Sequence, residues 1–515
     1  MALARAIATL GGWTMASRLL GFCRDILLAS VIGAGMTADA FFVAFKFPNF
    51  FRRLFAEGAF NSAFVPLFTE RLTREGVGPA RRFAANVAAV MVGFMLCFTF
   101  VMQLAMPWLM YVIAPGFGDQ PEKFALAVEL TRLTFPYLMF MALTALLAGM
   151  LNSLQRFAAA AAAPIVLNLV LIAALALVRS GKLALPAHVL ATAVSIAGAG
   201  QFLLLVFACQ RAGIMLRLPR PRLTRGVRRV FRLMVPSLIG AGVVQVNLVI
   251  DVFLASLLPQ GSVSWLYYAD RVNQLPLGVV GVAVGVALLP LLSRHLSAGD
   301  DKAAAQTQNR AIEFALLLTL PAAAALLAIP GPVVTVLFQR GAFGTADAAA
   351  TTGALAAFAI GLPAYVLIKA FTPGFFARQD TKTPVKIAVL SMTANVVFAI
   401  VLMQFLAHVG IALATACSAW MNATLLAVTL HRRGQLRLDA RLKSRAPRIA
   451  AAALCMVAAL LAMERMLAPL FAGDAEQKIL ALILLVAAGL AAYGVVAQLA
   501  GAARLADLRA AMRRR

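Results

Sequence analysis

Basic and acidic side chains gather near the N-terminus, in segments that are otherwise apolar enough to cross a membrane. Two such segments meet at a glycine-rich corner, Gly33 and Gly35. A cation facing lipid at the bilayer centre costs at least ~3 kcal/mol, so five would cost on the order of 15 kcal/mol, more than a typical fold can spare. We therefore expect these side chains to line a wet cavity inside the protein. They are Arg18, Arg24 and Asp25 in the first segment, and Asp39, Lys46, Asn49, Arg52, Arg53 and Glu57 in the second.

The spacing within the second segment predicts a helix with one polar face. Successive polar residues are seven, three, four and four positions apart, which places them on one side of a helix. The face consists of Asp39, Lys46, Asn49, Arg53 and Glu57, with Arg52 beside it.

These residue types indicate an anion site. The planar guanidinium group can bind two phosphate oxygens at once. The expected substrate-binding residues around a pyrophosphate are Arg18, Arg24, Arg52, Arg53, Arg271 and Asn49. Residues expected to balance charge or form gate pairs are Asp25, Asp39, Lys46, Glu57, Asp270 and Asp251.

The alternative is that these charges pair only with one another. Arg53 could pair with Glu57 at i,i+4, and Arg24 or Arg18 with Asp25. Six cations (Arg18, Arg24, Lys46, Arg52, Arg53, Arg271) stand against four acids (Asp25, Asp39, Glu57, Asp270), which leaves two positive charges over. That excess favours an anionic ligand.

The composition identifies a polytopic membrane protein. Of 515 residues, 62% are hydrophobic and 13% charged, with a mean hydropathy of +0.89, whereas soluble domains hold about 25% charged residues. The net charge of +26 therefore indicates membrane topology rather than nucleic-acid binding. The five cysteines stand singly, without metal or disulfide spacing. Arg18 and Arg24 interrupt the N-terminal apolar run, which argues against a cleaved signal peptide.

Fourteen apolar stretches are long enough to span a bilayer. They are 7–33, 37–66, 84–113, 127–152, 158–178, 185–209, 230–258, 263–292, 311–338, 347–371, 384–406, 409–430, 449–471 and 478–501.

Basic residues concentrate in every second connection. The connections 211–232 and 432–448 are the richest, and 513–515 is all arginine. The positive-inside rule therefore predicts that both termini are cytoplasmic. Contact with anionic lipids is an alternative use of these linkers.

The chain also resembles itself. RDILLASVIG (24–33) matches IDVFLASLLP (250–259) at an offset of about 226, and Gln155 matches Gln379 at about 224. An offset that covers an even number of crossings predicts two parallel six-helix lobes around a central cavity. The expected divisions are 1–215, 216–435 and a two-helix appendage at 436–515.

Enzyme chemistry is not indicated. The four histidines lie near predicted helix ends, and no HExxH, P-loop or Cys/His metal pattern occurs. We expect no cofactor and no metal, and transport driven by the membrane potential or an ion gradient.

Four stretches carry a resemblance to a known family. SRLLGFCRD, GAGMTADAFFVAFKFPNFFRRLFAEGAFNSAFVPLF, GSVSWLYYADRVNQLPLGVVGVAVGVALLP and PGFFARQDTKTPVKIA resemble the bacterial MurJ (MviN) lipid II flippases, of the multidrug/oligosaccharidyl-lipid/polysaccharide exporter superfamily. The resemblance implies two six-helix lobes around a cavity, with two further helices that form a hydrophobic groove. It also matches the family's cavity residues to Arg18, Arg24, Arg52, Arg271 and Asp39.

The implied function is transport of the undecaprenyl-pyrophosphate-linked peptidoglycan precursor, lipid II, from the inner to the outer leaflet of the bacterial cytoplasmic membrane. Lipid II and membrane lipids are the implied partners, and cell-wall synthesis or division proteins are candidates. Three alternatives remain: an exporter of another polyprenyl-linked saccharide, a drug exporter, and a polyprenyl-phosphate enzyme. A cationic drug would require an acidic cavity, and an enzyme would require a catalytic cluster that the sequence lacks.

Overall fold

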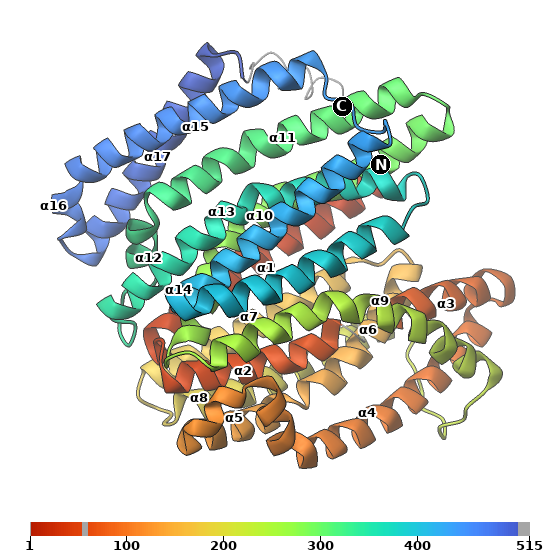
Figure 1. Ribbon diagram of the computed structural model, residues 1–515. Coiled ribbons are helices and arrows are strands. Elements are labelled where there is room, and N and C mark those ends of the chain that lie inside the picture. The colour runs from red at the N-terminus through yellow and green to blue at the C-terminus, as the bar shows by residue number, and fades with distance from the viewer. Residues whose placement is uncertain (1, 54–59, 503–515) are drawn as a thin grey trace. The chain divides into compact units, whose positions relative to one another are not determined.

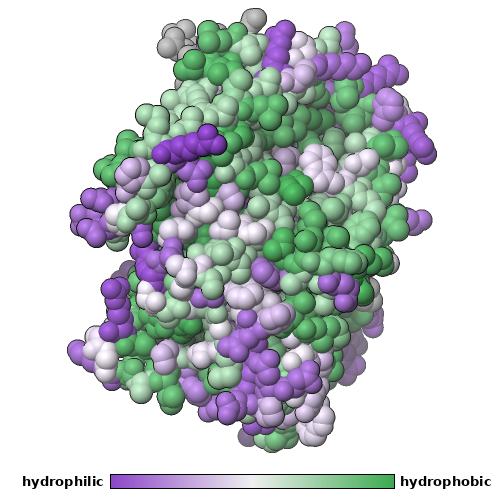
Figure 2. Space-filling view, turned by 60° about the vertical axis from the view of Figure 1, so that its left-hand side comes forward, coloured by the Kyte–Doolittle hydropathy of each residue, from purple (hydrophilic) through white to green (hydrophobic). Residues whose placement is uncertain are grey.

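The protein is helical throughout the part that its computed structural model describes, residues 2–53 and 60–502 (Figure 1). In this part, nine helical stretches are long and apolar enough to cross a membrane. Apolar side chains cover broad areas of the face in Figure 2, as expected of a surface in contact with lipid. The prediction of an all-helical polytopic membrane protein is confirmed, whereas the count of fourteen spans stays a prediction.

The first ten elements run from the N-terminus to Ser256. They are α1 (Ala2–Ile32), α2 (Met36–Phe51), α3 (Asn61–Glu75), α4 (Val77–Ile113), η2 (Pro115–Asp119), α5 (Pro121–Thr134), α6 (Tyr137–Ser153), α7 (Ala158–Arg179), α8 (Pro186–Arg211) and α9 (Arg225–Ser256).

The remaining eight elements follow a short turn. They are α10 (Ser262–Ser297), α11 (Asp301–Ala328), α12 (Pro330–Phe338), α13 (Thr345–Phe376), α14 (Lys382–Arg432), α15 (Ala440–Met466), α16 (Ala468–Phe471) and α17 (Ala475–Leu499).

Two compact units divide the chain. The first comprises Met1–Ser264 with Arg340–Phe343, and the second comprises Trp265–Gln339 and Gly344–Arg515. In the first unit α7 packs on α1 and α8, α2 packs on α5, and α3 packs on α4, α6 and α9. In the second, α13 packs on α11 and α14, and the α15–α17 pair packs on α11 and α12. The three-part division expected from the sequence stays a prediction.

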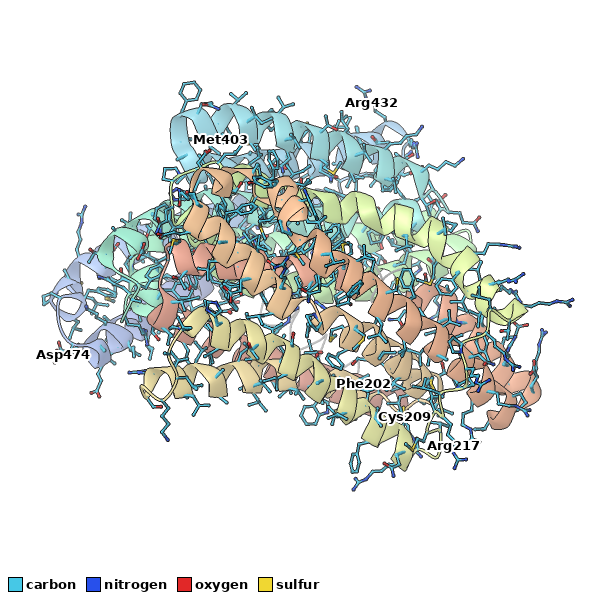
Figure 3. The ribbon with its side chains drawn as sticks, turned by 90° about the horizontal axis from the view of Figure 1, so that it is seen from below. Phe202, Cys209, Arg217, Met403, Arg432 and Asp474 are labelled. Atoms are coloured by element: carbon cyan, nitrogen blue, oxygen red, sulfur yellow. The ribbon has the colours of Figure 1, made fainter. Side chains whose placement is uncertain are left out.

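Several predicted spans are interrupted, in each case for a local backbone reason. The span 127–152 divides into α5 and α6 at Phe135 and Pro136, because proline has no N–H to continue a helix. By contrast, the spans 384–406 and 409–430 are the two helical parts of α14, divided by a kink at Ala407 (φ 47°, ψ −130°), as the predicted boundary requires. Figure 3 shows Met403 before this bend and Arg432 at the end of the helix.

The same type of turn occurs at matching positions in the two predicted repeat halves. Gln155 and Gln379 both adopt a left-handed conformation, with φ of 58° and 60°. In each case the next amide bonds back to a carbonyl five residues earlier, Arg156 to Leu151 and Asp380 to Phe375. This is the Schellman pattern that ends helices, and it occurs at the offset expected from the sequence.

Arg340–Phe343 packs against the end of α1 within the first unit. The amide of Ala342 donates to the carbonyl oxygen of Ser30 at 2.9 Å. Gly341 has φ +59°, and a Cβ there would collide with that same carbonyl oxygen. The close approach therefore requires glycine at this position.

We predict that Gly341→Ala destabilises the protein more than Gly434→Ala. Both glycines are left-handed (φ +59° and +69°), but a Cβ at Gly434 would meet nothing within 4 Å. The backbone cost of about 1–2 kcal/mol is therefore common to both variants, and only Gly341→Ala adds a collision. Apparent melting temperatures in detergent would measure the difference, and equal shifts would show that the contact with α1 is not tight.

Candidate functional site

Asp39 accepts four hydrogen bonds. It lies in the first turn of α2 and is 1% exposed. Its Oδ2 accepts from the Lys123 ammonium at 2.8 Å and from the amide of Gly261 at 2.8 Å. Its Oδ1 accepts from the amide and the hydroxyl of Ser264, at 3.0 and 2.6 Å. These four donors satisfy the carboxylate and stabilise its charge.

Lys123 is a member of this site that the sequence analysis missed. It stands in the first turn of α5, is 2% exposed, and also lies 4.2 Å from the Phe117 ring. A buried ammonium is nearly always paired, so the buried Asp39 required a cation of this kind. With Lys123 and Asp251 included, the set holds seven cations and five acids, so the excess of positive charge stays at two.

Pro48 interrupts the hydrogen bonding of α2, and a neighbouring helix repairs it. Because Pro48 has no N–H, the carbonyl oxygen of Ala44 loses its helical donor. The hydroxyl of Thr134, at the end of α5, donates to that oxygen at 2.7 Å. The carbonyl oxygen that Pro48 leaves without a helical donor is therefore hydrogen-bonded.

Asn49 and Arg52 form the next layer of α2. The Asn49 Nδ2 donates to the carbonyl oxygen of Phe45 at 2.8 Å. Its Oδ1 in turn accepts from Arg52 Nε at 3.0 Å. Asn49 therefore orients the guanidinium of Arg52 without cancelling its charge.

Arg24 is buried in α1, with 6% of its surface exposed. Its Nε and Nη2 donate to Asp25 Oδ1 at 3.0 and 2.7 Å, and its Nη1 donates to Asn168 Oδ1 at 3.0 Å. Asn168, on α7, also donates to the carbonyl oxygen of Ser17 at 2.9 Å. Arg24 is thus fixed by one acid, as the internal-pairing alternative expected, and by one amide that the sequence analysis missed.

The other charged side chains of α1, α2 and the residues just after α2 are more exposed to solvent. Arg18 and Arg53 are exposed, and Lys46 is half-buried. Glu57 lies outside the described residues, so its expected pairing with Arg53 stays a prediction. Asp39 in the first turn of α2 is buried, whereas Arg53, just after the helix, is exposed.

Asp251, Asp270 and Arg271 complete the predicted set. Asp251 is half-buried on α9 of the first unit. In the second unit, Asp270 accepts a hydrogen bond from Gln274 Nε2, and the Arg271 guanidinium lies 4.7 Å from the Tyr267 ring centre. The aromatic face stabilises the cation.

The first unit therefore combines fixed cations with satisfied acids. Asp39 pairs with the Lys123 ammonium, and Asp25 pairs with the Arg24 guanidinium. Arg52 donates to a neutral amide oxygen, that of Asn49. Such an arrangement favours binding of a phosphate or pyrophosphate group.

Comparison with known proteins decides the family. The profile described as "Lipid II flippase MurJ" matches residues 28–480. A probable lipid II flippase MurJ of Rhizobium meliloti (strain 1021) is 47% identical over 519 residues, covering 100% of this chain and 97% of that protein. The chain belongs to the MurJ family of lipid II flippases. It is a membrane transporter and not an enzyme, which removes the polyprenyl-phosphate enzyme from the alternatives.

Two solved structures have folds similar to that of this chain. A lipid II flippase MurJ in an inward closed conformation matches with a TM-score of 0.79 at 24% identity, covering 95% of this chain and 98% of that one. An inward-facing multidrug resistance MATE family transporter of the MOP superfamily matches with a TM-score of 0.69 at 14% identity, covering 83% and 98%. At these identities the likeness concerns the fold alone, so the MATE match does not support drug export.

We predict that Asp39 and Lys123 are energetically coupled. Removing one partner of a buried ion pair costs about 3–5 kcal/mol, because the other charge stays buried. Lys123→Met and Asp39→Asn should therefore each lower the melting temperature, and the double variant should lose less than the sum of the two. Additive losses in this double-mutant cycle would contradict the pairing.

Proposed function

We propose that this MurJ-family chain moves lipid II from the inner to the outer leaflet of the bacterial cytoplasmic membrane by alternating access. The support is a full-length family match together with the buried Arg24 in α1 and the half-buried Arg52 at the end of α2. Burial of cations in such helices is costly and marks a pathway for a substrate. The observation that carries the proposal is the full-length similarity to a MurJ relative; the guanidinium of Arg52, which donates to Asn49 at 3.0 Å, is a candidate phosphate contact.

The headgroup site is proposed to consist of Arg18, Arg24, Arg52, Arg53 and Arg271. With Lys123 and Asp251 included, the set holds seven cations and five acids, and an excess of two positive charges suits a pyrophosphate. Five further residues balance the charge and form the gate pairs: Asp25, Asp39, Lys46, Asp251 and Asp270. Binding of the anion relieves repulsion among the arginines, which allows the two lobes to rock to the outward state.

The wider architecture in this proposal is that of two six-helix lobes with both termini in the cytoplasm. The matching turns at Gln155 and Gln379 support the repeat, and the basic connections support the topology. The polyprenyl tail stays in lipid, along α15 and α17. The membrane potential or an ion gradient drives the cycle, and cell-wall synthesis or division proteins are candidate partners.

We predict that Arg52→Ala and Arg271→Ala each reduce flipping about 10- to 100-fold. That range corresponds to the loss of one charged hydrogen bond, worth about 1.5–3 kcal/mol. Arg74→Ala is the matched control, because Arg74 is exposed and paired with Glu70 at 3.1 Å. The measurement is lipid II exposure on the outer leaflet of cells depleted of their own flippase, with membrane insertion checked by immunoblotting.

Normal lipid II exposure in the Arg52→Ala and Arg271→Ala cells would overturn the proposed headgroup site. Loss of exposure in Arg74→Ala as well would mean that surface charge, and not the proposed site, supports transport.

A further inference from the structure

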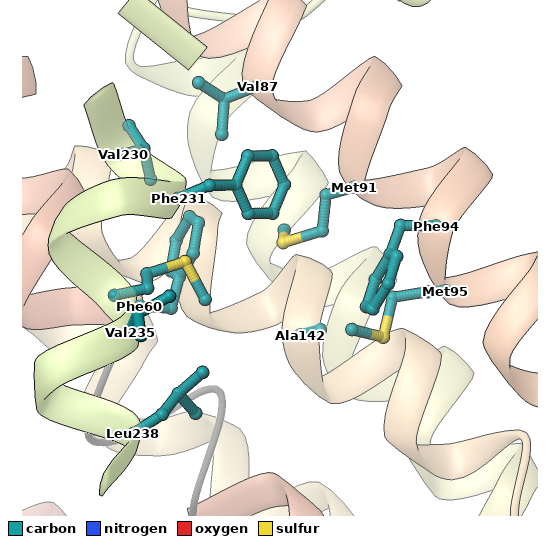
Figure 4. A pocket seen from close by; sticks show the side chains of 11 residues that line it. Phe60, Val87, Met91, Phe94, Met95, Ala142, Val230, Phe231, Val235 and Leu238 are labelled. Carbon is teal, nitrogen blue, oxygen red and sulfur yellow. The ribbon is translucent and has the colours of Figure 1, made fainter. Parts of the chain in front are cut away.

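An apolar cavity opens between α4, α6 and α9 of the first unit (Figure 4). It has a volume of about 180 Å³, and all eleven side chains that line it are apolar. They include Phe60, Val87, Phe94, Met95, Val230 and Val235.

The cavity has a buried floor and an exposed mouth. Phe60 and Met95 are 3% and 4% exposed, whereas Phe94 and Val235 are 45% and 54% exposed. Water entering here would find no side-chain hydrogen-bond partner, so it would not stay. In a membrane-spanning unit, the natural occupant of such a cavity is a hydrocarbon chain.

Arg71 lies one helical turn from this cavity. Its guanidinium carbon is 4.1 Å from the ring centre of Phe83, which precedes Val87 by four residues on α4. Gly226 precedes Val230 by four residues on α9, and a Cβ at Gly226 would lie 2.7 Å from Arg71 Nη2. The guanidinium therefore lies between the two helices that wall the cavity.

The surroundings of Arg71 are strongly basic. The acid beside it in sequence, Glu70, is bonded to Arg74 instead, at 3.1 Å. Exposed arginines flank the same end of both helices: Arg81 and Arg82 on α4, and Arg228, Arg229 and Arg232 on α9. The basic connections place this end at the cytoplasmic leaflet, where anionic headgroups are available.

We propose that this cavity and Arg71 form a binding site for an anionic phospholipid. One acyl chain enters the cavity past Phe94 and Val235, and the phosphate lies against Arg71 and Arg228. Arginine fits this role because it can bind two phosphate oxygens while its plane stays on the Phe83 ring. The site shares no residue with the proposed headgroup site, and of the proposed function the inference uses only the topology that places this end at the cytoplasmic leaflet.

The test is native mass spectrometry of the full chain with phosphatidylglycerol or phosphatidylethanolamine of identical acyl chains. The wild-type protein should retain more phosphatidylglycerol than phosphatidylethanolamine. Arg71→Gln should reduce that preference about tenfold, the effect of one charged hydrogen bond. Val235→Trp closes the exposed mouth and should reduce retention of both lipids, whereas the matched control Arg74→Gln should change neither.

Three results would overturn the proposal. Equal retention of the two lipids by wild type would mean that no headgroup is recognised. Equal effects of Arg71→Gln and Arg74→Gln would mean that diffuse surface charge attracts the lipid. Displacement of phosphatidylglycerol by equimolar lipid II, with both lost in Val235→Trp, would assign the cavity to the polyprenyl tail.

Discussion

A charged group inside a membrane-spanning segment must be held by partners, and the first unit is arranged around this constraint at Asp39. An isolated carboxylate in apolar surroundings costs several kcal/mol. Asp39 avoids that cost through one ammonium, two backbone amides and one hydroxyl. Its donors come from the start of α5 and from the turn at Gly261–Ser264. Satisfying one carboxylate therefore fixes the position of α2 against two other segments.

The same helices solve a second problem, which is the backbone at Pro48. A carbonyl without a donor is costly where no water can reach it. Thr134 supplies the donor for Ala44 from the end of α5, while Lys123 at the start of α5 bonds Asp39. Helix α5 is thus bonded to α2 near both of its ends. This rigid pair presents Asn49 and Arg52 in a defined orientation, which a bent and unsupported helix would not do.

The sequence predicts the elements and the charged residues, but not the partners that hold them. Helices follow from long apolar runs, and the adjacent pair Arg24–Asp25 was among the alternatives because its residues are neighbours. Lys123, Asn168 and Thr134 were missed because they bond residues 84, 144 and 90 positions away. Spacing along one helix carries no information about such distant contacts. Asn168 did leave a signal, since a lone amide in an apolar span marks a polar partner.

The chemical types of those partners affect the local balance of charge. An aspartate in place of Asn49 would orient the Arg52 guanidinium equally well but would add a negative charge beside it. Asn49 supplies the same acceptor geometry while staying neutral. Asp39, in contrast, has a charged partner. Lys123 neutralises this acid, which would otherwise weaken the electrostatic field of the arginines. Asp39 is neutralised by an ammonium, and Arg52 is oriented in part by a neutral amide. The predicted set holds more cations than acids, and a pyrophosphate carries the complementary charge, whereas a cationic drug would be repelled.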